Sequence, residues 1–384
     1  MNRLIIIGNG FDMAHGLKTS YMDFINWYWE QRAKAFAQEY TNVSKDCLCT
    51  FLINPEAFRF YESWAYFNRF NYLNTQNGKD IIQYIKEQTD RFTIEYSPFF
   101  ETILQSIETK GWVDIENDYY QLLTKKIKNP NCNYTIEELN EQLAFLQQKL
   151  IEYLNTISID INYDKERKDI SNIIEDFFNP ADFAIGSKKI AMDYLGLDIN
   201  ISSIKEIHDL KELEKLVPQR IMLLSFNYTQ TASLYKACGK DYGKDTQCNY
   251  IHGQLEDPEH IIFGYGDELD KSFQQILDMN DNRLLNNIKS VRYLETGHYR
   301  RLLEFLMAAP FQVFIMGHSC GNSDRTLLNT IFEHENCMSI KPFYHKSEDG
   351  KDNYMEITQN IYRNFTDMKL FRDRVVNKKR CISF

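Results

Sequence analysis

Short apolar runs that stop abruptly at a glycine or a polar turn constrain this chain most strongly, because each has the length of a buried strand rather than of a helix. They gather toward the two ends of the sequence, at Arg3–Ile7, Arg220–Phe226, Asn249–His252, His260–Tyr265, Phe311–Gly317 and Ile340–Tyr344. Helix-period patterns lie between several of them, at Thr229–Cys238, Asp270–Val291 and Ser323–His334. This alternation predicts an α/β fold with a mostly parallel sheet and flanking helices.

The middle of the chain, from about residue 31 to 217, has long helix-period patterns and hardly a strand signal, so we interpret it as a large helical insertion. Its clearest helix begins at Thr135, which can form a capping box with Glu138. The leucine spacing that follows favours one face of an intramolecular bundle over an intermolecular coiled coil. We therefore predict a discontinuous core, residues 1–30 and 218–346, with the insertion 31–217 and a C-terminal extension, 347–384.

Composition excludes some classes of partner. The 384 residues carry a formal net charge of −10, which argues against nucleic acid because non-specific affinity for it depends on Lys and Arg. The eight cysteines are scattered without a CxxC pair, so we expect them to be reduced. The longest apolar stretch, Phe305–Met316, is interrupted by Pro310 and Gln312 and cannot span a bilayer. We expect a cytoplasmic protein with no membrane partner.

A glycine-rich turn follows the first predicted strand, in the segment Gly8-Asn9-Gly10-Phe11-Asp12. The two glycines let a ligand approach the backbone, and successive N–H groups can form an anion-binding nest. A plain tight turn explains the same pattern, and the spacing departs from the GxGxxG dinucleotide fingerprint because position 13 is Met. Asp12 can cap the next helix or bind a ribose hydroxyl, and the sequence does not decide between these roles.

Two further strand ends carry polar side chains. One apolar run ends at Ser225 and presents Asn227 just beyond it, and another ends at His252. Ligands bind at the carboxyl edge of open α/β sheets, and an imidazole there can act as an acid or a base near neutral pH. Structural roles are the alternatives, because an Asn often satisfies its own turn and a lone His is often part of the core.

The last such segment, Gly317-His318-Ser319-Cys320-Gly321, supports two functional interpretations. Its GxSxG spacing between a strand and a helix matches the nucleophile elbow of α/β-hydrolases, with Ser319 as the nucleophile. Only about 65 residues follow it, which leaves little scaffold for the remaining catalytic residues. The same turn, together with Asp324, could instead provide backbone donors and polar side chains for a nucleotide.

The order of these segments resembles the NAD-binding core of sirtuins, and the whole chain resembles the bacterial abortive-infection AbiH family. Gly8-Asn9-Gly10-Phe11-Asp12 is similar to the sirtuin Gly-Ala-Gly-x-Ser, and Ser225-Phe226-Asn227-Tyr228-Thr229 is similar to Thr-Gln-Asn-Ile-Asp. Ile251-His252-Gly253 is similar to the catalytic His-Gly, and Gly317-His318-Ser319 to the later Gly-Thr-Ser turn. The resemblance implies a Rossmann-like, sirtuin-like sheet that binds a nicotinamide dinucleotide.

The resemblance also implies a chemistry, cleavage of the nicotinamide–ribose bond of NAD. Asn227 would hold the ribose hydroxyls or the attacking water, and His252 would be the general base. The residues expected to bind the dinucleotide are Gly8, Asn9, Gly10, Phe11, Asp12, Ser225, Gly317, His318, Ser319 and Asp324. No metal is required, because nicotinamide leaves as a neutral base. The AbiH resemblance implies defence against bacteriophage by NAD depletion, with a phage-derived trigger as a partner; whether the chain forms a homo-oligomer stays open.

Departures from the sirtuin pattern narrow this expectation. Sirtuins carry a zinc module of paired CxxC motifs, whereas Cys47-x-Cys49 alone lacks the ligand count. We therefore expect NAD hydrolysis rather than protein deacylation, with a module that senses NAD or ADP-ribose without turnover as the alternative. The segment Trp112-Val113-Asp114-Ile115-Glu116 resembles an AbiH segment whose Glu116 approaches the site, but an acidic first turn that complements a helix dipole explains it equally well.

Overall fold

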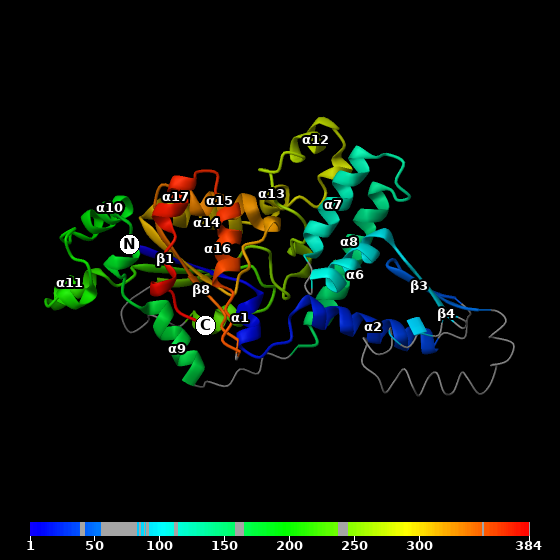
Figure 1. The fold of residues 1–384 in the computed structure, drawn as a ribbon, viewed down its shortest axis with the longest axis horizontal. Helices are drawn as coiled ribbons and strands as arrows, with labels where there is room; N and C mark the ends of the chain where they lie inside the picture. Colours follow the sequence, from blue (N-terminus) through cyan, green and yellow to red (C-terminus); the bar gives the residue numbers. More distant parts are fainter. Residues whose placement is uncertain are drawn as a thin grey trace. The chain divides into compact units, whose positions relative to one another are not determined.

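The computed structural model describes residues 1–38, 43–54, 92–110, 114–157, 165–236, 245–347 and 349–383, together with residues 83, 86, 87 and 89. The chain divides into two compact units (Figure 1). Unit 1 comprises Met1–Leu17, Ser158–Phe273 and Ile288–Phe384. Unit 2 comprises Lys18–Ile157 and Gln274–Asn287.

Unit 1 is built on a five-stranded sheet in which every neighbouring pair of strands is parallel. The strands are β1 (Asn2–Ile7), β5 (Arg220–Ser225), β6 (Asp245–Tyr250), β7 (Phe311–Met316) and β8 (Cys337–Phe343), in the spatial order β6-β5-β1-β7-β8. Counted along the chain, this order is 3-2-1-4-5, so the direction of winding reverses between β1 and β7. The predicted parallel α/β fold is confirmed, and its topology is Rossmann-like.

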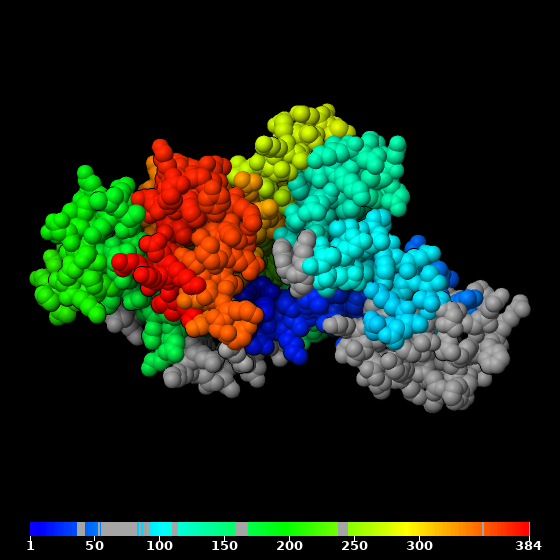
Figure 2. Space-filling view, viewed as in Figure 1, coloured from blue at the N-terminus to red at the C-terminus, as the bar shows by residue number. Residues whose placement is uncertain are grey.

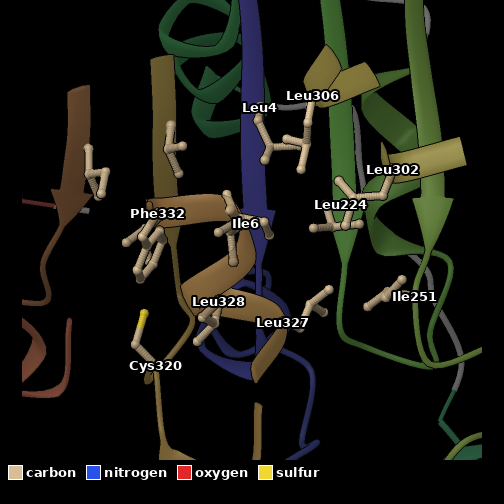
Figure 3. Packing of buried hydrophobic residues seen from close by; sticks show 14 of the residues in the cluster. Leu4, Ile6, Leu224, Ile251, Leu302, Leu306, Cys320, Leu327, Leu328 and Phe332 are labelled. Carbon is tan, nitrogen blue, oxygen red and sulfur yellow. The ribbon is translucent and has the colours of Figure 1, made fainter. Parts of the chain in front are cut away.

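Helices cover both faces of the sheet, because the buried central strand β1 alternates its apolar side chains between them. Leu4 and Ile6 pack in one cluster with α14 (His298–Ala308) and α15 (Arg325–Phe332), as Figure 3 shows. Ile5 and Ile7 belong to a second cluster on the opposite face. The other helices in unit 1 are α1 (Asn9–Ala14), α9 (Lys165–Glu175), α10 (Ile185–Leu195), α11 (Leu210–Lys215), α13 (Lys289–Arg292), α16 (Tyr354–Arg363) and α17 (Met368–Arg374).

Two predicted elements were wrong. The run His260–Tyr265 is buried but forms no strand: its backbone begins in the 3-10 turn η5 (Pro258–His260), and Tyr265 makes only an isolated bridge with Ile288. The pattern Asp270–Val291 is not one helix, because Asn280 adopts a left-handed φ of 49° between α12 (Phe273–Asp278) and α13. The residues Ile261–Tyr265 are buried, whereas most of Asp270–Val291 is exposed or half-buried.

Two other predicted helices form in part. The pattern Thr229–Cys238 becomes the 3-10 helix η3 (Thr231–Tyr235), and its end at Cys238 lies outside the described residues. The pattern Ser323–His334 becomes the 3-10 turn η8 (Asn322–Asp324) followed by α15.

Unit 2 contains α2 (Tyr21–Gln38), α6 (Pro98–Lys110), α7 (Ile115–Lys128), α8 (Ile136–Leu154) and most of α12. The predicted capping box at Thr135 is confirmed, since Glu138 N–H donates to Thr135 Oγ1 (3.1 Å) and Thr135 N–H donates to Glu138 Oε2 (2.7 Å). Unit 2 also has an antiparallel sheet, β2 (Val43–Lys45), β3 (Cys49–Ile53) and β4 (Phe92–Tyr96), which the sequence patterns did not predict. None of the described helices combines the length and apolar composition needed to cross a bilayer.

Candidate functional site

The loops that follow β1 and β7 meet at the point where the strand order reverses. Gly8 N–H donates to Met316 O (3.1 Å), and Gly10 N–H donates to Gly317 O (2.8 Å). A Cβ on Gly317, whose φ is +69°, would lie 2.1 Å from Phe11 N. A Cβ on Gly8 would likewise lie 2.5 Å from the Cα of His318. The glycines in both loops are therefore required by the direct contact between the two backbones.

This contact bears on the predicted anion nest. The N–H groups of Gly8 and Gly10 donate across to β7 and its loop, and Phe11 N–H donates to Gly8 O (2.9 Å). These three donors are thus used within the protein, and a phosphate at this edge would need other groups. Asn9 is the exposed residue of the turn, whereas Phe11 is fully buried.

A cluster of buried polar side chains lies beside the first loop and brings together residues from the segments that follow β1 and β5. Asn227 Nδ2 donates to Gly8 O (3.0 Å), and the Thr229 hydroxyl donates to Asp12 Oδ2 (2.6 Å). Burial raises the pKa of Asp12, while hydrogen bonds from Thr229, Thr231 and Asn227 oppose that rise. Asp12 therefore lies inside the protein, hydrogen-bonded to Thr229 across 217 positions of sequence.

Ser225 has a local role at the end of β5. Its side chain lies within hydrogen-bond distance of both backbone groups of Asn227, the N–H (3.2 Å) and the carbonyl oxygen (3.2 Å). With 1 % of its surface exposed, Ser225 fixes the turn that presents the Asn227 amide.

A second buried group is ionic, and it gathers side chains from segments after β6 and β7. His252 Nε2 lies 3.2 Å from Asp324 Oδ1 and 3.2 Å from the Tyr293 hydroxyl. Lys289 Nζ lies 2.7 Å from the same Asp324 Oδ1, and His318 Nε2 lies 3.7 Å from Asp324 Oδ2. We call these five residues the Asp324 cluster. Sequence reasoning found three of them and missed Lys289 and Tyr293, which lie in α13 and the 3-10 turn η7 (Tyr293–Glu295).

Protonation in the Asp324 cluster follows from its burial. Burial would raise the pKa of Asp324, but Lys289, His252 and His318 together hold it below its ordinary value. Burial and Lys289 lower the pKa of His252, against the opposing effect of Asp324. Burial lowers the pKa of His318 to about 4, again against Asp324. The cluster is therefore one ionised Lys289–Asp324 pair with two neutral imidazoles at neutral pH.

The two imidazoles are fixed by their neighbours. His318 Nδ1 accepts the N–H of Cys320 (2.9 Å), which leaves the ring proton on Nε2, facing Asp324. The Phe226 ring packs against both rings, with centroids 5.1 Å from His252 and 4.2 Å from His318. The apolar ring thereby shields both imidazoles from water and strengthens the electrostatics of the cluster.

A pocket of about 440 Å³ opens at the same edge of the sheet, next to the two meeting loops. Gly10, Gly317, His318 and Ser319 form one side, as expected for a site at the reversal point. The rest of the lining is Met13, Ala14, Phe343, His345, Asn353, Glu356, Ile357 and Asn360. In Figure 2 the orange surface of α16 borders the dark blue surface of the N-terminal segment.

The contribution of α16 was missed, because residues 347–384 were interpreted only as an extension. Tyr354, Ile357 and Ile361 are buried at helical spacing, and this pattern was a usable signal for a helix packed on the sheet. Asn360 Nδ2 donates to Ser319 O (2.8 Å), which fixes the helix against the β7 loop.

The alternative hydrolase reading finds little support in this geometry. Ser319 is exposed, but the left-handed residues of the turn are Gly317 and Cys320, with φ values of 69° and 54°, rather than the serine. Within the described ranges, no histidine lies at hydrogen-bond distance from the Ser319 hydroxyl.

The acidic segment in unit 2 has a structural explanation at one position. The Asp114 side chain accepts the N–H of Asn117 (3.0 Å) and caps α7, as the helix-start interpretation predicted. Glu116 is buried in the first turn of the same helix, and Trp112 and Val113 lie outside the described residues. In the described part of the chain, no group of three or more His, Cys, Asp or Glu residues could hold a metal ion.

Together, the 3-2-1-4-5 strand order, the glycine loops at its reversal point and the adjoining pocket define a doubly wound α/β protein with a pocket at the carboxyl edge of its sheet. A family model described as "Bacteriophage abortive infection AbiH" matches residues 4–345. The chain therefore belongs to the AbiH family, and this membership implies a role in phage abortive infection. No curated protein matches the sequence.

Proposed function

We propose that this AbiH protein binds NAD at the reversal point of its sheet and hydrolyses the nicotinamide–ribose bond. One observation carries the proposal: a neutral, buried imidazole, His252, is held by a carboxylate and a hydroxyl at the carboxyl end of β6. A neutral imidazole can accept a proton, and Asp324 at 3.2 Å can stabilise the imidazolium that results.

The proposed reaction uses water as the only co-reactant. Water attacks C1′ of the nicotinamide ribose, the bond from C1′ to the pyridine nitrogen breaks, and nicotinamide leaves with the bonding electron pair. The products are ADP-ribose, nicotinamide and one proton. His252 Nε2 takes that proton from the water or from a ribose hydroxyl, and the Asn227 amide orients the ribose or the water. The Tyr293 hydroxyl, 3.2 Å from Nε2, is at the distance that a reacting hydroxyl would need.

The pocket supports binding of a nucleoside part of the ligand. Among the described residues that line it, Glu356 is the one carboxylate, and neither Lys nor Arg is present. Met13, Phe343 and Ile357 offer apolar surface for a base. This lining suits an uncharged base and ribose better than it suits a phosphate.

The test is incubation of the purified full chain with NAD, followed by chromatography of the products. Wild type should release nicotinamide, whereas Asn227→Ala and His252→Ala should release at least about a hundredfold less, the usual effect of removing a general base. His208→Ala is the matched control, because His208 is exposed and lies outside the site. No release from wild type in the presence of a phage lysate, or equal release from all variants, would overturn the proposal.

A second function, sensing of NAD or ADP-ribose without turnover, is favoured by one observation. Asn227 and His252 are both almost fully buried and already hydrogen-bonded within the protein. A sensor would be stabilised against heat by ADP-ribose and would form no product. Thermal unfolding with and without ligand, measured alongside nicotinamide release, separates the two functions.

A further inference from the structure

Lys289 is a lysine buried inside unit 1, with 1 % of its side chain exposed. A buried ammonium is tolerated only with a close counter-charge, and Asp324 Oδ1 at 2.7 Å supplies it. The same carboxylate oxygen lies 3.2 Å from His252 Nε2. One oxygen is therefore shared between the ammonium group of Lys289 and an imidazole that can become charged.

The backbone around this lysine is built to hold it. Lys289 N–H donates to Tyr265 O (3.0 Å), while Gly266 N–H donates to Ser323 O (3.0 Å). A Cβ on Gly266 would lie 3.3 Å from the Cβ of Lys289, so the glycine leaves room for the lysine side chain. The segment Tyr265–Gly266 thereby ties the chain at Lys289 to the chain at Asp324.

His252 Nε2 has two polar neighbours that suit opposite protonation states of this nitrogen. The Tyr293 hydroxyl at 3.2 Å can donate to an unprotonated Nε2, whereas the Asp324 carboxylate can only accept, so it pairs with an Nε2 that carries a proton. The groups facing His252 are Lys289 from α13, Tyr293 from η7, Asp324 from η8, and His318 from the loop after β7. Of these, Lys289 is the one whose charge opposes protonation and whose position is fixed by an ion pair.

We propose that Lys289 is a positioning residue that occupies Asp324, so that the carboxylate orients His252 without charging it before the reaction. In the resting protein, Nε2 accepts from Tyr293. When Nε2 takes a proton, the N–H that forms points to Asp324 Oδ1, which then interacts with two cations. The meaning of this arrangement for catalysis rests on the proposed NAD hydrolysis, but the electrostatic assignment can be tested without it.

The geometry gives two substitutions with opposite effects. Lys289→Met removes the competing cation, so Asp324 should pair with a protonated His252 and raise the midpoint of its titration. Asp324→Asn leaves a buried ammonium near the ring, so the midpoint should fall. A charge at this distance changes the protonation constant by about tenfold or more. A merely structural role would not move the two midpoints in opposite directions.

The experiment is an NMR titration of the His252 ring in the full chain, run with the pH profile of nicotinamide release. Lys341→Met is the matched control, because Lys341 forms another buried ion pair, with Asp182 at 2.9 Å, outside the Asp324 cluster. The control should leave the His252 midpoint unchanged. Tyr293→Phe provides a milder variant that keeps both charges, and it should raise the midpoint by removing the donor to the neutral ring.

The outcomes separate the two proposals. Opposite shifts of at least about tenfold in the protonation constant support the role of Lys289, whether or not nicotinamide is released. Shifts in the same direction, or none, overturn it even if NAD is hydrolysed. If Lys289→Met does not fold, the other two variants decide. The role of Lys289 is overturned if the midpoint of the His252 titration is unchanged in Tyr293→Phe and does not fall in Asp324→Asn. If the His252 midpoint shifts in opposite directions in Lys289→Met and Asp324→Asn but no nicotinamide is released, only the proposed hydrolysis is overturned.

Discussion

Substitution of Gly317 by alanine probes the contact between the two loops directly. The new Cβ would lie 2.1 Å from Phe11 N and 2.5 Å from the carbonyl carbon of Gly10, and both atoms are backbone. Because real Cβ contacts stay above about 3 Å, the loops must separate by roughly 1 Å. Loss of the hydrogen bonds from Gly8 and Gly10 costs about 1 kcal/mol each, and an alanine at a left-handed φ costs about 1–2 kcal/mol. We expect unfolding to become easier by about 3–4 kcal/mol.

Gly16→Ala is the matched control for that substitution. Gly16 also has a left-handed φ, +76°, but nothing lies within 4 Å of its added Cβ. Only the backbone cost of about 1–2 kcal/mol applies there. The comparison therefore isolates the effect of the loop contact from the effect of the dihedral angle.

The assay must report on unit 1. All four tryptophans lie between residues 27 and 112, within the sequence of unit 2, so their fluorescence does not follow the sheet. Hydrogen exchange of the β1 amides gives the free energy of opening of the central strand. Equal losses of protection in Gly317→Ala and Gly16→Ala would refute the reasoning, because the backbone overlap would then have no energetic effect.

Three further predictions concern other parts of the fold. Burial keeps His318 neutral, with its pKa lowered to about 4. The free energy of unfolding should therefore fall by up to about 3 kcal/mol as the pH drops from 6.5 toward 4, because the unfolded chain takes up a proton at this histidine first. Acid unfolding of the His318→Gln variant should lack that part of the loss. Arg3→Met removes the donor to Ile174 O (3.0 Å) and Asp176 O (2.6 Å), and β1 exchange should show a loss of about 2–4 kcal/mol. Thr135→Ala removes the cap of α8 and should cost about 1 kcal/mol in urea unfolding followed by tryptophan fluorescence; an unchanged midpoint would contradict it.

Three strands of the sheet, β1, β5 and β7, could be predicted because each is mostly apolar and has a definite end. The strand β6 (DTQCNY) has no apolar run, and the predicted Asn249–His252 overlaps it only at Asn249 and Tyr250. β1, β5 and β7 fall within one residue of their predicted bounds, since strands buried on both faces need apolar residues throughout. The run at His260–Tyr265 has the same composition, but Ile262 N–H donates to His252 O, beyond the end of β6. Apolar composition predicts burial for the strands and for this run alike. A buried run becomes a strand only where a neighbouring strand is available to form the hydrogen bonds of a sheet.

The location of the candidate site residues could be predicted where they follow parallel strands directly. Asn227, His252 and His318 lie at such ends, and the topology brings all strand ends to one edge of the sheet. Lys289 and Tyr293 come from short irregular turns between Tyr265 and α14, where no periodic pattern indicates which side chains face inward. Their burial follows from tertiary packing, and no local pattern in the sequence indicates it.

The position of β1 in the sheet also determines when this protein can become complete during synthesis. Arg3 pairs with Ile221 on one side and with Gln312 on the other, so β1 obtains its second neighbour only after β7 has been made. At about 5–20 residues per second, a ribosome needs on the order of ten seconds or more to supply the first partner strand. Through that interval the apolar residues Leu4–Ile7 must be shielded by other means, which makes early chaperone contact valuable to this chain. A chain interrupted before Phe311 lacks the second loop altogether, so the edge at Gly8 and Gly317 exists only after Gly317 has been made.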